Sequence, residues 1–393
     1  SQKKEQYLLF MKLSNFLIGI LIIALFLGGF FYFRAHNSLR SSCANISNPS
    51  ECWDNQIKKG LEADGVEGAF KKISEFYNEY PNFSGACHSI MHTIGDKGYQ
   101  DFKIGKPVLY SPKMNSCSFG FFHGFMEALL AESHELKEAT DFCIGQSVSD
   151  KTWIPRDECF HGIGHGITDN HTPDEWKNVH MIIERSTTLC RSIRYTEKDF
   201  SKCLGGVYNA VANAYREGNY GLVIDSADPL KLCKFVKKDN YKQDCYNYMA
   251  RVLLKIPPFG FESAIHLAGV YSPSEYIINT IGGVSIMISH NNLPDEEVID
   301  VCKKLQDNFK NVCIRAYAIG LVQVGEAGAE HKKALTFCTK IPGEPEQKIC
   351  FKGVISELSK YWYWQENKRL DNVCKLVEKK SRHSCGLALI ELK

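Results

Sequence analysis

The chain begins with one long apolar segment. Residues 14–33 (SNFLIGILIIALFLGGFFYF) contain no charged side chain, and a helix of this length spans roughly the 30 Å hydrocarbon core of a bilayer. The segment ends in Phe and Tyr, whereas small residues would precede the cleavage site of a signal peptide. The pattern predicts an uncleaved transmembrane anchor at 14–33, preceded by a short tail at 1–13.

After the anchor, apolar positions follow the 3.6-residue period of helices, and alternating strand patterns are rare. We therefore expect an all-α fold, in which the transmembrane helix is followed by αα-hairpin repeats. The expected segments are a cap or linker at 34–80, helical repeats that bear His, Asp and Glu at 81–175, and disulfide-linked helical repeats at 176–393.

Cysteines recur with the helical pattern. One cysteine lies near the end of a helix, a short polar loop follows, and a second cysteine begins a helix rich in small residues. The pairs that this spacing predicts are Cys43–Cys52, Cys143–Cys159, Cys190–Cys203, Cys233–Cys245, Cys302–Cys313, Cys338–Cys350 and Cys374–Cys385. One unit has Ala268 and Thr280 in place of such a pair. A period of roughly 33 to 44 residues with two helices per unit predicts a solenoid stapled by disulfides.

This cysteine pattern resembles the disulfide-stapled Sel-like repeats, which are related to tetratricopeptide repeats. The resemblance covers residues 143–393, and the Leu-Gly positions typical of that family are present only in fragments such as Leu204-Gly205. It implies an exported α-solenoid that binds other molecules. It implies no functional residue.

Cys87 and Cys117 remain after this pairing. Both begin helices that bear histidines, so a disulfide between neighbouring helix starts is one interpretation. The other is a thiolate ligand or redox thiol at Cys87, beside His88. All sixteen cysteines follow the anchor. This distribution predicts a cytoplasmic N-terminus and a bulk that faces a periplasm, the cell exterior or an organelle lumen.

Three successive helical segments carry histidines and carboxylates at four-residue spacing. They read CHSIMHTIGD from Cys87, CSFGFFHGFME from Cys117 and CFHGIGHGITD from Cys159. Residues four apart share one face of a helix, so each segment is expected to present a stripe of these groups. The candidate metal ligands are His88, His92, Asp96, His123, Glu127, His161, His165 and Asp169.

The later repeats provide an internal comparison. At the position of His165 they carry Asn209, Arg251, Ile286, Ile319 and Ser356, and at that of Asp169 they carry Asn213, Lys255, His290, Gln323 and Lys360. The fold therefore does not require His or Asp there. The clustered histidines are either ligands of one or two transition metal ions, such as Zn, Fe, Mn or Cu, or hydrogen-bonded polar residues of the interior. Haem is a further alternative, although the chain lacks a C-x-x-C-H motif.

Glycines flank these histidines at Gly120, Gly124, Gly162, Gly164 and Gly166. Glycine costs a helix about 1 kcal/mol relative to alanine, so these positions need a compensating role. Close approach of two helices and space for a ligand are both compatible with the pattern.

The net charge and the absence of several motifs argue against some classes of partner and activity. The 47 basic and 45 acidic residues leave a formal net charge of +2, which gives no global field for nucleic acid. P-loop, G-x-S-x-G and H-E-x-x-H motifs are absent from the sequence, so nucleotide binding and serine hydrolase activity are not expected. The expected partners are the membrane, through 14–33, and a protein on the solenoid surface.

Two functions follow from these observations. The first is a membrane-anchored exported metalloprotein, a metal-dependent hydrolase or oxidoreductase, because a metal with an open position can acidify water or activate dioxygen. The second is a non-catalytic scaffold or adaptor subunit of a membrane complex, in which the histidines belong to the interior or to the recognition surface.

Overall fold

The computed structural model describes residues 43, 46, 49–106, 111–145, 156–193, 196–365 and 368–392. The chain divides into two compact units, Ser1–Gln56 and Ile57–Lys393. The predicted anchor at 14–33 lies outside the described residues. Within the described ranges, no helix is long and apolar enough to cross a membrane.

The described residues form helices and turns and contain no strand, which confirms the all-α prediction. The α-helices are α2 (Pro49–Glu79), α3 (Ser84–Lys103), α4 (Ser116–Ser133), α5 (Leu136–Gly145), α6 (Arg156–Asp169), α7 (Val179–Ser192), α8 (Glu197–Glu217), α9 (Asp239–Met249), α10 (Phe261–Tyr271), α11 (Ile277–Ile288), α12 (Asp295–Lys303), α13 (Asp307–Gln323), α14 (His331–Lys340), α15 (Glu344–Leu358), α16 (Trp362–Gln365) and α17 (Arg382–Glu391). Short 3-10 helices supplement them, including η5 (Lys231–Phe235), η6 (Ala250–Lys255), η7 (Ser289–Asn291) and η9 (Leu370–Leu376).

Local sequence signals set the ends of these helices. At the start of α8, the backbone N–H of Asp199 donates to the Thr196 hydroxyl at 3.2 Å, and the Thr196 N–H donates to the Asp199 carboxylate at 2.9 Å. This reciprocal cap satisfies two N–H groups that the helix cannot pair internally. The helix ends at Gly218, where a φ of 69° favours glycine. Arg156 also donates two 2.8 Å bonds to Asp199, which ties α6 to α8.

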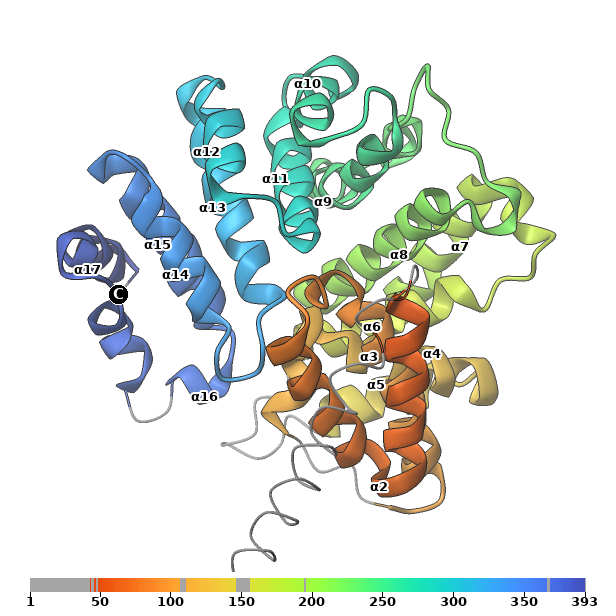
Figure 1. The fold of residues 1–393 in the computed structure, drawn as a ribbon. Helices are drawn as coiled ribbons and strands as arrows, with labels where there is room; N and C mark the ends of the chain where they lie inside the picture. The colour runs from red at the N-terminus through yellow and green to blue at the C-terminus, as the bar shows by residue number, and fades with distance from the viewer. Residues whose placement is uncertain are drawn as a thin grey trace, which may run out of the picture. The chain divides into compact units, whose positions relative to one another are not determined.

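The helices are stacked in pairs. In each pair a first helix packs against the second helix that follows it in the chain. Examples are α7 with α8, α12 with α13 and α14 with α15. The second helices pack side by side in one continuous row, which runs α3, α4, α6, α8, α9, α11, α13, α15 and α17 (Figure 1). Each apolar stripe is therefore buried against the next unit, as in repeat architectures generally.

The row curves until its beginning touches its later part. Helix α3 contacts η7, and α4 contacts α13. The Tyr77 hydroxyl donates to the carbonyl of Val324 at 2.8 Å, and the rings of Phe119 and Tyr361 stack with centroids 5.3 Å apart. The second helices consequently face a common interior, an arrangement that the sequence pattern did not reveal.

The sixteen cysteines form eight disulfides, and seven of these are the pairs that the spacing predicted. The eighth joins Cys87 of α3 to Cys117 of α4, so Cys87 is neither a free thiol nor a ligand in this structure. In the unit without a disulfide, the hydroxyl groups of Ser272 and Thr280 lie 2.7 Å apart and form a buried hydrogen bond. Eight disulfides indicate an oxidising, extracytoplasmic location.

Glycines allow the second helices to touch along their backbones. A Cβ atom on Gly164 of α6 would lie 1.9 Å from the carbonyl oxygen of Cys203 in α8, and one on Gly124 of α4 would lie 2.1 Å from that of His92 in α3. The same relation holds between Gly283 of α11 and Asn247 of α9, at 1.9 Å. Of the two roles that the sequence left open for these glycines, the structure supports close helix approach.

We predict that Gly164→Ala destabilises the protein by at least about 1–3 kcal/mol, because α6 and α8 must separate to admit the methyl group. Gly269→Ala in α10 is the matched control, since a Cβ there meets no atom within 4 Å. We expect it to stabilise by about 0.5–1 kcal/mol. Chemical denaturation of both variants measures the difference. Equal stability of the two variants would show that the close contact at Gly164 does not matter.

Candidate metal centre and cavity

Helices α3, α4 and α6 bring the five predicted histidines into one cluster. His123 of α4 lies in the middle, with ring centroids 5.0 Å from His88, 5.4 Å from His92, 5.0 Å from His161 and 4.5 Å from His165. Three overlapping groups have ligand atoms within 4.8 Å of one another. They are His88, His92 and His123; His123, His161 and His165; and Glu127, His165 and Asp169. These groups could each hold a metal ion.

Asp96 is the predicted ligand that the structure does not bring to the cluster. It is exposed on α3 and belongs to none of the three groups. An α-helix rotates about 100° per residue, so a position eight residues after His88 is turned by about 80° from it. The stripe therefore drifts away from the cluster. Asp169, eight residues after His161, is likewise exposed but stays beside Glu127.

His88 and His92 are held with their Nε2 atoms facing each other. His88 Nδ1 lies 2.8 Å from the carbonyl oxygen of Cys117, and His92 Nδ1 lies 2.9 Å from the carboxylate of Glu127. A carbonyl and a carboxylate only accept hydrogen bonds, so both Nδ1 atoms carry the hydrogen. The two Nε2 atoms are 3.2 Å apart. In neutral imidazoles both would then present lone pairs to each other, an arrangement that is stabilised either by a proton on His92 Nε2, which then donates to His88 Nε2, or by a metal ion between them.

His123 supplies a third nitrogen to this position. Its side chain is only 2% exposed, yet neither ring nitrogen has a hydrogen-bond partner. His165 Nε2 is likewise buried without a partner. Leaving a buried polar atom unpaired costs about 1–3 kcal/mol, and such atoms in a native protein call for an explanation. Coordination to a metal ion would satisfy them.

Two further ligand candidates, His161 and Glu127, are partly engaged. The amide of Asn209 donates to His161 Nε2 at 3.1 Å, and the Tyr248 hydroxyl lies 3.5 Å from His161 Nδ1. Glu127 bridges two histidines, since its other oxygen lies 3.5 Å from His165 Nδ1. The group of His88, His92 and His123 is therefore the freest of the three groups, and Glu127 orients its members from outside.

Metal binding requires neutral imidazole, and lowered pKa values favour this form in four of the five histidines of the cluster, His88, His123, His161 and His165. Burial, followed by the neighbouring histidines, holds the pKa of His123 well below 6.5, and burial lowers the pKa of His161 to about 3. Burial alone would lower the pKa of His92 too, but the Glu127 carboxylate raises it. Asp169 keeps an exposed surface, yet desolvation and the charge of Glu127 raise the pKa of its carboxyl group.

We predict that the metal-free protein loses stability as the pH falls below about 6.5. The folded pKa values of His88, His123, His161 and His165 lie below the unfolded value, so the unfolded chain binds protons that the folded chain does not. Each such histidine lowers the free energy of unfolding by up to about 1.4 kcal/mol for each pH unit below 6.5, and it has no effect above 6.5. His92 and Asp169 have raised pKa values and oppose this trend, because their stabilisation is present in acid and is lost as the pH rises.

Denaturant titrations of metal-free protein between about pH 7.5 and pH 5.5 measure this effect. In the variant His161→Gln, the free energy of unfolding should fall less steeply with decreasing pH, by the amount that corresponds to one bound proton. A free energy of unfolding that stays constant, or rises, as the pH falls below 6.5 would show that these imidazoles are not buried in the neutral form.

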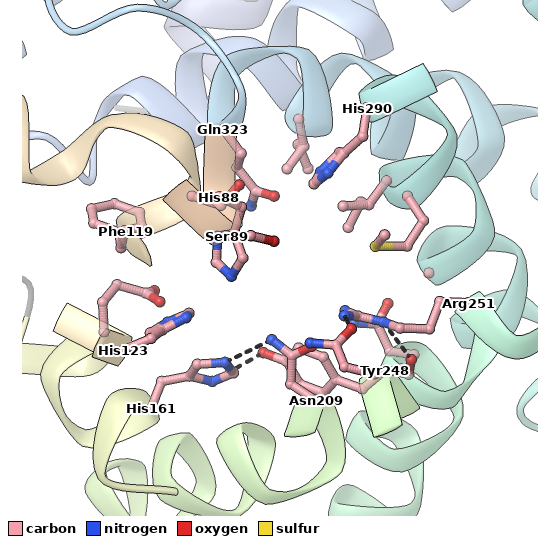
Figure 2. Close-up of a pocket in the computed structure, with 18 of the residues that line it drawn as sticks. His88, Ser89, Phe119, His123, His161, Asn209, Tyr248, Arg251, His290 and Gln323 are labelled. Carbon is pink, nitrogen blue, oxygen red and sulfur yellow. Dashed lines mark hydrogen bonds between the residues drawn. The ribbon is translucent and has the colours of Figure 1, made fainter. Parts of the chain in front are cut away.

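A cavity of about 480 Å³ adjoins the cluster. Helices α3, α4 and α6 line it with His88, His92, His123 and His161, and the remaining wall comes from later repeats. Figure 2 shows His88, His123 and His161 on one side and Arg251 and His290 on the other. This volume falls in the range of small-molecule sites. An ion bound at His88, His92 and His123 would therefore be open to a small substrate.

Sequence reasoning missed the polar wall opposite the histidines, although its signal was present. The residues aligned with His165 and Asp169 in the later repeats served only to show that the fold tolerates other side chains. The structure places most of them on the cavity: Asn209, Asn213, Arg251, Ile286, His290, Ile319, Gln323 and Lys360. Polar side chains that persist at one register of successive repeats indicate a shared interior face.

Comparison with known proteins does not assign this architecture to a family. The stacked helix pairs and the eight disulfides agree with the coarse features of the resemblance, but they do not identify Sel-like repeats. No protein-family model matches this chain, and no curated protein or solved structure is significantly similar to it.

Proposed function

We propose that the protein is a metalloprotein that binds a transition metal ion through His88, His92 and His123. The observation that carries this proposal is the pair of Nε2 atoms 3.2 Å apart, each on a ring whose Nδ1 is already hydrogen-bonded. Two nitrogens at about 2.0 Å from a tetrahedral ion are separated by about 3.3 Å. Glu127 resembles the carboxylate partner that orients metal-binding histidines in many proteins.

Zn, Fe, Mn and Cu all accept nitrogen and oxygen ligands, so the donor set is compatible with each. His161, His165 and Asp169 adjoin the first group and offer ligands for a second ion. The cavity beside His88 and His123 supports a catalytic role, because catalytic metal sites keep a position open to substrate. We propose a metal-dependent hydrolase or oxidoreductase, since a bound ion can acidify water or, if it is iron or copper, react with dioxygen.

We further propose that this protein is an exported solenoid of the Sel-like type, anchored in a membrane by residues 14–33. The disulfides support export, and the row of stacked helix pairs supports a repeat architecture. The apolar segment at 14–33 supports the anchor.

Metal analysis of the purified full-length protein tests the proposal. We expect about one or two equivalents of a transition metal. Glu127→Gln keeps the size of the side chain but removes the carboxylate that accepts from His92, so we expect metal affinity to fall about 10- to 100-fold. Glu132→Gln is the control, because Glu132 is exposed and pairs with Lys103. Metal-free protein that folds and captures a protein partner would favour a scaffold instead.

A further inference from the structure

Arg251 is a buried cation without an anionic partner. Its side chain projects from η6 and is 9% exposed. Its Nε donates to the Tyr248 carbonyl at 3.1 Å, and its Nη1 donates to the Asn213 amide oxygen at 2.7 Å. Both acceptors are neutral. Within the described part of the chain, Arg251 makes no ion pair and its Nη2 donates to no group.

The other cations around the cavity are already paired. Lys360 lies 2.6 Å from Glu357, and Arg216 lies 2.7 Å from Glu217. Lys202 lies 3.7 Å from Asp157 and 3.9 Å from Glu158. Among the described residues that line the cavity, Arg251 is therefore the cation that no carboxylate contacts directly. A buried charge without a counterion is costly, and proteins retain such groups chiefly where a ligand compensates them.

The positive field of Arg251 extends across the cavity. Arg251 lines the same cavity as His88, His161 and His290. Burial lowers the pKa of Arg251 itself to about 9, which leaves it charged at neutral pH. His290, on the same side of the cavity as Arg251, keeps a buried Nε2 atom without a partner (Figure 2).

We propose that the cavity binds a small oxyanion, a carboxylate or a phosphate group, on the guanidinium of Arg251. The planar fork of arginine matches these groups, and the free Nη2 together with the remaining N–H of Nη1 can donate to them. Asn213 and the Tyr248 carbonyl fix the guanidinium in place before the anion binds. The cavity of about 480 Å³ holds a molecule of metabolite size.

This placement bears on the metal reaction. An organic anion held at Arg251 extends toward His88, His123 and His161 on the opposite wall (Figure 2). If the proposed function is correct, the substrates are small carboxylates or phosphate esters whose reacting bond lies beside the metal. The anion site itself does not depend on the metal.

Calorimetric titration of metal-depleted full-length protein tests the anion site. The probes are inorganic phosphate and succinate, used separately at constant ionic strength and about pH 8. We expect saturable 1:1 binding of at least one probe. Arg251→Gln should weaken this binding by about tenfold or more, because a charge-assisted hydrogen bond is lost. Arg216→Gln, the paired cation on the same cavity, should change it by less than about twofold.

Absence of binding by both probes in the wild-type protein would overturn the inference, and so would equal binding by Arg251→Gln. Because that variant removes an unpaired buried charge, we expect it to fold, and thermal unfolding checks this. If it does not fold, Arg251→Lys replaces it, and binding as tight as in wild type would contradict the role of the fork. Metal content is measured on the same preparations, so loss of metal with intact phosphate binding would contradict only the proposed function.

Discussion

The variant His88→Ala/His123→Ala is expected to lose the ion held by His88, His92 and His123, so its metal content falls by about one equivalent per chain. The substitutions remove two of the three nitrogens of the freest group, and one imidazole does not hold a transition ion against solvent. His266→Ala is the control, because His266 is exposed on α10 and far along the chain from the cluster. Inductively coupled plasma mass spectrometry measures the metal content of each protein.

The same comparison separates coordination from folding. Both ring nitrogens of His123 already lack a hydrogen-bond partner among the described residues, and disulfides still tie α3 to α4 and α5 to α6, so the metal-free variant should retain its helical circular dichroism. A variant that folds and keeps its full metal content would place the ion elsewhere. His161→Ala/His165→Ala would then show whether the second group, which shares His123, is the principal site.

Reduction of the disulfides is expected to unfold the second unit. Six of its bridges tie the first helix or 3-10 helix of a pair to the second, and the seventh joins α3 to α4. In the chain-entropy model a short loop of this kind contributes about 3 kcal/mol. Their sum is large compared with the 5–15 kcal/mol by which a typical domain is stable. Circular dichroism with and without a thiol reductant should therefore show loss of helix at a temperature where the oxidised protein is folded.

A single bridge gives a quantitative version of this prediction. Cys190→Ala/Cys203→Ala removes the link between α7 and α8 and should lower the free energy of unfolding by about 3 kcal/mol. Cys43→Ala/Cys52→Ala is the control, since that bridge lies in the first unit, Ser1–Gln56. Unchanged stability of the Cys190 variant, or helix content that survives full reduction, would show that packing alone stabilises the row.

Much of the fold followed from local patterns. The cysteine spacing predicted the seven short-range pairs because their cysteines are only 9 to 16 residues apart, a separation that one short loop between two helices produces. Cys87 and Cys117 stayed ambiguous because a separation of 30 residues does not by itself identify neighbours. The curvature of the row depends on contacts such as Tyr77 with Val324, which no periodicity encodes.

The candidate site was predicted in part for the same reason. The four-residue spacing brought out the five histidines, Glu127 and Asp169, because successive repeats place equivalent positions side by side. It also included Asp96, which is exposed on α3 and belongs to none of the three groups. Arg251 was overlooked because its significance lies in the absence of a carboxylate partner, which only the three-dimensional arrangement reveals.

X-ray absorption spectroscopy at the edge of the bound metal tests the central claim most directly. The account predicts a first shell of nitrogen and oxygen atoms at about 2.0–2.2 Å, with the outer-shell scattering of at least two imidazole rings. His88→Ala should reduce that imidazole signal. A protein that binds no metal when supplied with it, or a spectrum without imidazole scattering, would contradict the assignment of these histidines as a metal centre.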